Sequence, residues 1–539
     1  MQLVIQLSDV QRITKSKTCM RRGGLRLEVL DMDCNCNACM EKRRATSQEI
    51  KNCLFSIGGL KAPEPDGIPA KFFQAHWSTC KDDIAKMVKE CFDKCELPEN
   101  LNNTLIALIP KVASPLSMKQ MQPISLCNTL YKVVSKIIVQ RLRPMMSMLV
   151  SPSQVSFIPS RNIIDNIIVA QEMLHKFRNS KGNLEFMAWK IDLAKAYDKL
   201  QWQFIESVLW EVGIRGKLLQ LMIQCFTSVN SRVIFNGEAT EDFCPESGLR
   251  QGDPLSPYLF VLCMEKLSHL LNFQVKQGRW KPMKICRNGP VVSHLFFVDD
   301  LILFGEASLA QAEVMRSCID CFCLNSGQEV SFEKSSIFCS PNTEEGLAMH
   351  ISNICGSPLS DDLGNYLGIP LLHSRVTPDT YKSLVEKVQL RLASWKSHTL
   401  SMVGRHTLIQ SVRFEEVKLC ESSFVSQNWM ETAPKGQGLW AEALNKKYLK
   451  DDCIMQKSTL PFSASSNTWK GILYGAQLLP NGVKWRIGPG TEISFWNDVW
   501  TDLGALSDIA LKPILSHLQG LRVCDVVCDG GWDLRIPRM

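Results

Sequence analysis

The alternation of apolar and polar residues changes period several times along the middle of the chain, which predicts a mixture of strands and helices. Residues 104–109 form a short apolar run, as expected of a buried strand. Residues 187–192 alternate with a period of two and predict a half-buried strand that ends at Asp192. Residues 293–304 form two apolar strands around Asp299 and Asp300, which predicts a hairpin with these two acidic residues as its turn.

Helical spacing is found between these strands. Apolar positions recur at helical intervals over residues 129–149 and 200–212, so each segment predicts an amphipathic helix. Residues 253–271 predict another helix, with Asp253 as its N-cap and Pro254 as its first residue, where a missing N–H costs nothing. The middle of the chain therefore predicts an α+β fold.

Composition places few limits on function. The chain has 539 residues, enough for about three to four domains at roughly 100–200 residues each. Its net charge of +7, from 61 basic and 54 acidic residues, suits a polyanionic partner without requiring one. No run of about 18 apolar residues occurs, so no membrane span is predicted.

The 22 cysteines follow no disulfide framework, and no secretory leader opens the chain. We therefore expect reduced thiols and an intracellular location, in the nucleus or the cytoplasm, with no targeting segment evident. Cys34, Cys36 and Cys39 form one close cluster. A zinc site needs about four ligands and no partner pair follows nearby, so an irregular N-terminal segment is the favoured interpretation.

The aspartates at the strand ends are the first candidates for chemistry. A carboxylate at the end of a buried strand is costly unless it is paired or binds a metal ion, and three such groups repel one another unless cations neutralise them. Two Mg²⁺ ions, with Mn²⁺ as the alternative, suit Asp192, Asp299 and Asp300 as oxygen ligands. The alternative interpretation is an ordinary turn, because Asp tolerates turn conformations.

Three ordered segments surround these aspartates, at residues 190–198 (KIDLAKAYD), 247–257 (SGLRQGDPLSP) and 293–300 (SHLFFVDD). In sequence, order and spacing they resemble the three palm motifs of reverse transcriptases. The particular residues in these motifs are similar to those of plant LINE-type (non-LTR) retrotransposon polyproteins. Further matches are residues 61–67 (KAPEPDG), 122–128 (QPISLCN), 154–166 with a Phe-x-Pro-x-Arg element, and 366–368 (YLG).

The resemblance covers about residues 55–413 and resumes weakly from about 437 to 500. It implies a right-hand polymerase of the α+β class, with fingers, an antiparallel palm sheet and a helical thumb. Its implied divisions are an irregular N-terminal extension at 1–48, fingers and palm at 49–344, a thumb or connection at 345–413, and a partial C-terminal region at 414–539 that precedes a missing zinc-binding module.

The resemblance also implies roles for single residues in the palm. Asp192 and Asp299 are expected to be the main metal ligands, with Asp300 beside them as a ligand or as charge support. Tyr197 is at the position of the ribose gate, where a bulky ring would clash with a 2′-hydroxyl and so select deoxynucleotides. The alternative for Tyr197 is a packed aromatic at a strand-to-helix junction.

Further residues are expected around the nucleotide. Arg250, Gln251 and Gly252 would face the incoming nucleotide and the template, and the alternative is a plain turn before a helix. Lys111 resembles a fingers lysine that contacts the triphosphate, and the alternative is a surface lysine. Lys334 resembles a lysine that protonates pyrophosphate as a general acid.

The implied activity is RNA-directed DNA polymerisation. The primer 3′-hydroxyl would attack the α-phosphorus in line, and positioning and metal charge would supply most of the catalysis. The expected partners are an RNA template, a DNA primer and deoxynucleoside triphosphates, with the nucleic acids held mainly through their phosphates. Protein partners are not indicated by the sequence.

Several positions depart from the family pattern. Gln122 stands at a usual Arg, which puts nucleotide affinity in doubt because a neutral amide does not reproduce a bidentate phosphate contact. Glu64 and Ser160 replace usual glycines, and Val298 replaces a usual Ala, which is expected to fit a strand. A decayed retroelement remnant that folds and binds nucleic acid is therefore one alternative. A second is an RNA-dependent RNA polymerase, disfavoured because such enzymes usually carry Gly at the position of Val298.

Overall fold

The structure is a computed structural model, and the ranges that it describes are residues 45–59, 65–180, 182, 184–373, 380, 382, 386, 438–449, 465–478, 494–497, 506–510, 514–516, 518–528 and 531–532. The chain separates into two units. The first contains residues 1–284 and 291–367, and the second contains residues 285–290 and 368–539. All the predicted site residues belong to the first unit.

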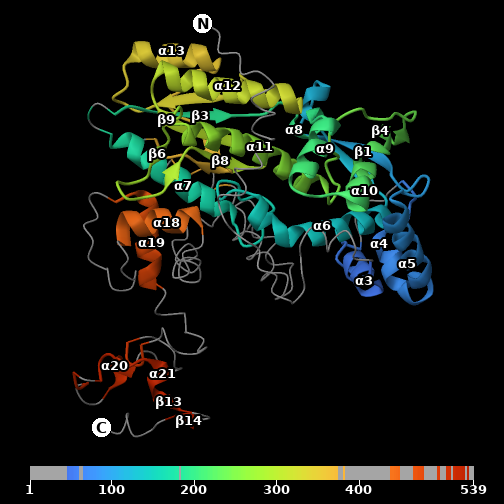
Figure 1. Cartoon of the computed structure of the whole chain (residues 1–539), viewed down its shortest axis with the longest axis horizontal. Helices are drawn as coiled ribbons and strands as arrows, with labels where there is room; N and C mark the ends of the chain where they lie inside the picture. Colours follow the sequence, from blue (N-terminus) through green and yellow to red (C-terminus); the bar gives the residue numbers. More distant parts are fainter. Residues whose placement is uncertain are drawn as a thin grey trace. The chain divides into compact units, whose positions relative to one another are not determined.

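A four-stranded antiparallel sheet with the strand order β10-β3-β9-β8 carries the predicted aspartates (Figure 1). Its strands are β3 (Phe186–Ile191), β8 (His294–Phe297), β9 (Asp300–Glu306) and β10 (Ser336–Cys339). The central strands β3 and β9 are buried along nearly their whole length, as their apolar runs predict. In Figure 1, α12 and α13 lie on one side of this sheet and α7 on the other.

A second sheet in the same unit has the order β2-β1-β4-β5. Its strands are β1 (Asn103–Pro110), β2 (Met121–Cys127), β4 (Asn230–Phe235) and β5 (Glu238–Ala239). β1 pairs antiparallel with β2 and parallel with β4. A short 3₁₀ helix, Met118–Gln120, leads into β2.

Helices cover these sheets and connect them. In the first unit they are α3 (Ser47–Phe55), α4 (Ala70–Ala75), α5 (Trp77–Lys94), α6 (Thr129–Leu149), α7 (Ile163–Arg178), α8 (Ala196–Lys199), α9 (Trp202–Glu211), α10 (Gly216–Thr227), α11 (Ser256–Lys276), α12 (Leu309–Ser326) and α13 (Glu345–Cys355). Short strands β6 (Met283–Lys284), β7 (Val291–Val292) and β11 (Asn365–Tyr366) complete this unit.

The second unit is described only in pieces. These are β12 (Ile369–Pro370), α18 (Leu439–Leu444), a π-helical turn (Asn445–Leu449), α19 (Asn467–Leu478), α20 (Leu506–Ile509), α21 (Val523–Val526), β13 (Val527–Cys528) and β14 (Gly531–Trp532). Within the described part of the chain, none of the helices has the length and apolar character that crossing a membrane requires.

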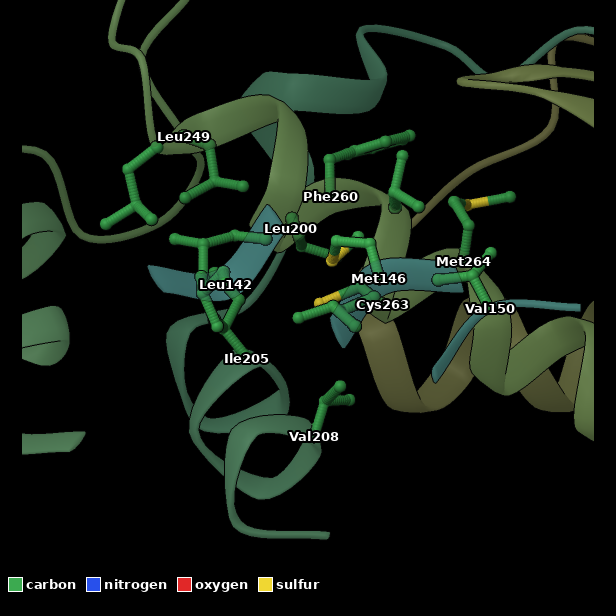
Figure 2. Close-up of a cluster of buried hydrophobic side chains, with 14 of the residues drawn as sticks. Leu142, Met146, Val150, Leu200, Ile205, Val208, Leu249, Phe260, Cys263 and Met264 are labelled. Atoms are coloured by element: carbon green, nitrogen blue, oxygen red, sulfur yellow. The ribbon is translucent and has the colours of Figure 1, made fainter. Parts of the chain in front are cut away.

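Sequence features explain where the helices begin and what they bury. A capping box starts α3, where Thr46 Oγ1 accepts from the N–H of Glu49 at 3.1 Å. Apolar side chains of α6 and α11 meet residues of α9 in one buried cluster (Figure 2), in which Met146, Ile205 and Phe260 have no exposed surface. Burying each such side chain contributes about 1.5–3 kcal/mol, so this cluster anchors the helices behind the aspartate-bearing sheet.

The predicted α+β class with an antiparallel palm sheet is confirmed, and the helix predicted at 129–149 has those bounds. The helix predicted at 253–271 begins later, at Ser256 with Leu255 as N-cap. The carboxylate of Asp253 accepts from the N–H of Leu255 at 3.0 Å, which forms a turn before the helix instead of the cap itself. The Cys34–Cys39 cluster, Glu64, and the thumb beyond α13 at 387–413 lie outside the described residues.

Candidate active site

Strand register brings the three aspartates to one end of one sheet. Ile191 in β3 pairs with Leu301 in β9, and the next residues along the two strands are Asp192 and Asp300. Asp300 in turn pairs with Phe297 of β8 across a tight turn that contains Asp299. The sequence separates Asp192 from the other two by about a hundred residues, and the antiparallel pairing removes that separation.

The turn of the hairpin is displaced by one residue from the predicted position. The prediction placed Asp299 and Asp300 in the turn, whereas the turn residues are Val298 and Asp299, and Asp300 begins β9. Val298 has φ 55°, in the left-handed region that a β-branched side chain strongly disfavours. The expectation that Val298 fits a strand is therefore wrong, and the backbone is strained beside the candidate catalytic residues.

The carboxylates of the hairpin are held where charge is costly. Burial raises the pKa of Asp299, and the charge of Asp192 raises it further. Burial raises the pKa of Asp300 to about 6, with a further contribution from Asp299, while Lys190 acts in the opposite direction. Oxygen ligands that repel one another in this way suit hard divalent cations, which would relieve the repulsion.

The aspartates share one sheet end without forming a ready coordination sphere. Within the ranges that the structure describes, no group of three or more His, Cys, Asp or Glu side chains stands at metal-holding spacing. The predicted metal-sharing distance among Asp192, Asp299 and Asp300 is therefore not met by the side-chain positions, and metal binding by them stays a prediction.

Lys190 is a site residue that sequence reasoning left out. Its Nζ donates to the backbone oxygens of Leu363 at 3.0 Å and Asn365 at 2.6 Å. Burial lowers the pKa of Lys190, and the charges of Asp300 and Asp192 act in the opposite direction. The alternation over 187–192 already placed Lys190 on the same face as Asp192, so the pattern contained the information.

The backbone of Asp192 is held by the segment that contains Lys334. The N–H of Asp192 donates to Ser335 Oγ at 3.1 Å, and its carbonyl accepts from the N–H of Ser331 at 2.8 Å. The N–H of Lys334 closes the same turn on the carbonyl of Ser331 at 3.1 Å, and the Lys334 residue is exposed. This turn fixes Asp192 and carries Lys334 on its surface.

Tyr197 is packed on one face of its ring. Its ring stacks on Phe260 of α11, with centroids 4.7 Å apart and planes 9° apart. Burial raises the pKa of Tyr197, and the charge of Asp299 raises it further. The stacking agrees with a packed aromatic at this junction, and the role of Tyr197 as a ribose gate stays a prediction.

Arg250 was predicted to face the incoming nucleotide and the template, but its guanidinium is turned towards partners inside the protein. Its side chain is 9% exposed and forms an ion pair with Asp253 at 2.8 Å. Nη1 donates to Asn102 Oδ1 at 2.7 Å and Thr104 Oγ1 at 2.9 Å, and Nη2 also donates to the carbonyl of Cys225 at 2.9 Å. The protein thus uses four guanidinium hydrogen bonds internally, which differs from the expected nucleotide contact.

Gln251 and Gly252 follow at the edge of β2. The N–H of Ser125 donates to the carbonyl of Gln251 at 2.7 Å. Gly252 has φ 118°, and a Cβ there would lie 2.5 Å from the carbonyl oxygen of Ser125, so only glycine fits. Lys111, which follows β1, is exposed. Burial raises the pKa of Asp198, and the positive charges of Lys195 and Lys111 lower it in part.

The segment around the Phe-x-Pro-x-Arg element holds the outer strand of the hairpin, a role that the motif alone did not indicate. Asn166 Nδ2 donates to the carbonyl of Phe296 at 2.7 Å, and the N–H of Phe296 donates to the carbonyl of Ser153 at 2.9 Å. Arg161 Nη1 donates to the carbonyl of Gln154 at 2.6 Å. Ser160 has φ 66°, which explains why glycine is the usual residue there.

These features agree with comparisons to known proteins. The family described as "Reverse transcriptase (RNA-dependent DNA polymerase)" matches residues 109–371. Residues 109–371 are therefore similar to a reverse transcriptase domain, and the relatives with this similarity are retrotransposon proteins.

The similar proteins include two that belong to transposable elements. The "Transposon TX1 uncharacterized 149 kDa protein" of Xenopus laevis is 27% identical over 372 residues, which are 68% of this chain and 28% of that protein. The Pol polyprotein of the type-2 retrotransposable element R2DM of Drosophila melanogaster is 25% identical over 278 residues, 51% of this chain and 24% of that protein. The chain thus spans about a quarter of the length of these relatives.

Two further similarities are shorter or more distant. An uncharacterized mitochondrial protein of Arabidopsis thaliana is 49% identical over 67 residues, 12% of this chain and 55% of that protein. Among solved structures, telomerase from Candida tropicalis in complex with a telomeric RNA fragment aligns with a TM-score of 0.36 and 13% identity, over 76% of this chain and 68% of that one.

Proposed function

We propose that the first unit is an RNA-directed DNA polymerase that extends a DNA primer along an RNA template with deoxynucleoside triphosphates. The observation that supports this most is the register that sets Asp192 beside Asp300 and next to the turn residue Asp299. Nucleotidyl transfer needs carboxylates at one point, and burial, together with the charges of Asp299 and Asp192, raises the pKa of Asp300, an effect that a bound divalent cation would offset.

Asp192 and Asp299 would hold two divalent cations, Mg²⁺ or Mn²⁺, with Asp300 as a further ligand or as charge support. When bound, such ions lower the pKa of an attacking hydroxyl and stabilise charge on the leaving phosphate. Tyr197 would exclude a 2′-hydroxyl, and Lys334, on the turn that holds Asp192, would give a proton to the leaving pyrophosphate.

The fingers and palm are proposed to occupy residues 49–344 and the thumb or connection residues 345–413, with extensions at 1–48 and 414–539. Lys111, Gln251 and Gly252 would lie on the nucleotide side of this palm. We further propose that the chain derives from a plant LINE-type element and acts inside the cell, in the nucleus or the cytoplasm.

The test is primer extension by the full chain on poly(rA)/oligo(dT) with Mg²⁺. Asp299→Asn and Asp300→Asn should each lower the rate at least about a hundredfold, because charge stabilisation by a metal contributes several kcal/mol. Asp320→Asn is the matched control, since Asp320 is an exposed carboxylate on α12 that pairs with Arg316 at 2.8 Å. Extension that survives both hairpin substitutions would exclude this active site.

The second candidate is a decayed remnant that binds nucleic acid without polymerising. Gln122 supports it, because its Nε2 donates to Gln251 Oε1 at 3.2 Å and offers a neutral amide where a phosphate-binding cation is usual. Wild-type chain that binds RNA but extends no primer would establish this candidate instead.

A further inference from the structure

Arg250 connects the loop before α11 to three other parts of the first unit. Its acceptors are Asn102 and Thr104 at the start of β1, and the carbonyl of Cys225 on α10. Its guanidinium also lies over the ring of Tyr131 on α6, 4.4 Å from the centroid. These contacts fix the position of the guanidinium in all directions.

Asp253 closes this arrangement on the other side of Gln251 and Gly252. Its Oδ2 accepts from Arg250 at 2.8 Å and from the hydroxyl of Tyr131 at 2.5 Å. Its Oδ1 accepts from the N–H of Leu255, next to the start of α11. The ion pair therefore holds both ends of a two-residue segment.

That segment is pressed against β2. The carbonyl of Gln251 accepts from the N–H of Ser125, and the backbone of Gly252 lies so close to the carbonyl of Ser125 that no side chain fits. The Gln251 side chain contacts Gln122 at the strand edge, at 3.2 Å. A small shift of Arg250 or Asp253 would thus displace Gln251 relative to β2.

We propose that Arg250 is a positioning residue, which with Asp253 sets the place of Gln251 and Gly252 against β2 so that the incoming nucleotide is bound in register with the template. This inference rests on the proposed polymerase function. A buried ion pair is often no more stabilising than apolar residues of equal volume, so geometry is the contribution that only this pair supplies. Lysine carries the same charge but cannot reproduce the planar fork.

Arg250→Lys in the full chain tests the proposal, with Arg141→Lys as the matched control. Arg141 is also a buried arginine, 5% exposed, paired with Glu49 through two contacts of 3.1 Å, and it lies over the ring of Phe92. In primer extension, Arg250→Lys should raise the KM for deoxynucleotide about tenfold or more with a smaller change in kcat, since a displaced loop would bind the nucleotide less well in the ground state and the transition state alike. Arg141→Lys should leave both constants near wild type.

Two milder variants guard against loss of folding. Thr104→Val removes one acceptor of Arg250, and Asp253→Asn removes the charge but keeps the acceptor for Leu255, so both should raise KM in the same direction. The double variant Arg250→Lys, Asp253→Asn should be no worse than the poorer single variant. Equal KM values for Arg250→Lys and Arg141→Lys, at equal folded fraction, would overturn the proposal.

Hydrogen exchange of residues 247–255 separates this inference from the proposed function. A wild-type chain that extends no primer would refute the polymerase, yet the loop can still be measured. Faster exchange in Arg250→Lys than in Arg141→Lys would uphold the positioning of the loop by Arg250. Unchanged exchange in both variants would refute it.

Discussion

Tyr197, the residue proposed to select the sugar of the nucleotide, is supported by stacking on a neighbouring ring. Its face rests on Phe260, so the ring cannot move away from the hairpin without breaking a stacked pair. This stacking also fixes the direction in which the Tyr197 hydroxyl points. The selectivity expected of Tyr197 therefore depends on a second residue that the sequence motif does not mark as functional.

Removing either ring should weaken the discrimination against ribonucleotides. Tyr197→Ala should raise incorporation of ribonucleotides relative to deoxynucleotides by at least about tenfold, and Phe260→Ala should produce a smaller rise, because the pair contributes about 0.5–1.5 kcal/mol beyond burial. The measurement is the ratio of kcat/KM for the two nucleotides. Phe204→Ala, which removes an aromatic pair between α9 and α12, should lower stability without changing the ratio.

For single residues, the sequence predicted their place in a strand or turn better than it predicted the direction in which each side chain points. The placement of Asp192 at the end of one strand and of Asp299 and Asp300 at a hairpin turn was predictable from the apolar runs beside them. Arg250 was not, because the same arginine can face a ligand or an interior partner, and its partners Asn102 and Cys225 are distant in sequence. Only tertiary structure decides between these directions.

The β8–β9 hairpin carries two of the three candidate metal ligands, Asp299 and Asp300. The sequence predicted both strands correctly but assigned the turn one residue too late, because Asp-Asp is a better turn former than Val-Asp. The pairing of Phe297 with Asp300 overrides that preference. The left-handed conformation of Val298 follows, since the first residue of such a tight turn must adopt it.

Glycine at position 298 should relieve this conformation. Val298→Gly should leave the free energy of unfolding within about 1 kcal/mol of wild type, because the loss of side-chain contacts is offset by about 1–2 kcal/mol of backbone relief. Val233→Gly, at a similarly half-buried valine in the regular strand β4, should lower it by about 1–3 kcal/mol. Urea unfolding of both variants gives the comparison, and equal losses would contradict the strain.

At the scale of the whole molecule, one buried carboxylate makes the stability of the first unit depend on pH. Glu265 on α11 accepts a hydrogen bond from Ser151 Oγ at 3.2 Å, and Ser268 of the same helix bonds the ring of His294 at 2.9 Å. Burial raises the pKa of Glu265 to about 7. Its contribution to stability is therefore full below the unfolded-state pKa and is lost as pH rises through about 7.

The free energy of unfolding should accordingly be greater at acidic than at alkaline pH within this window. Between pH 8 and pH 5.5, Glu265→Gln should flatten the dependence by about 2 kcal/mol, because a tenfold difference in proton affinity between the folded and unfolded states corresponds to about 1.4 kcal/mol. Urea unfolding of wild type and variant across this range checks the difference. Parallel curves would show that Glu265 ionises as freely in the folded chain as in the unfolded one.

The sequence predicted the class of the first unit because its strands and helices have clear and different periods. It did not predict how residues 151–166 hold β8. Asn166 and Ser153 bond the backbone N–H and carbonyl of Phe296, and because every residue has these groups, the sequence does not show which one is bonded. The division of the chain at Leu367 was likewise not evident from composition.

The close approach of Gly252 to Ser125 has a genetic consequence. Every change of the first or second base in a glycine codon replaces the amino acid or ends translation, and any replacement here would set a carbon atom 2.5 Å from a carbonyl oxygen. Among copies of the gene, those in which this codon no longer encodes glycine should encode a loop that cannot pack against β2. Sequencing that single codon would thus identify such copies before any protein is made.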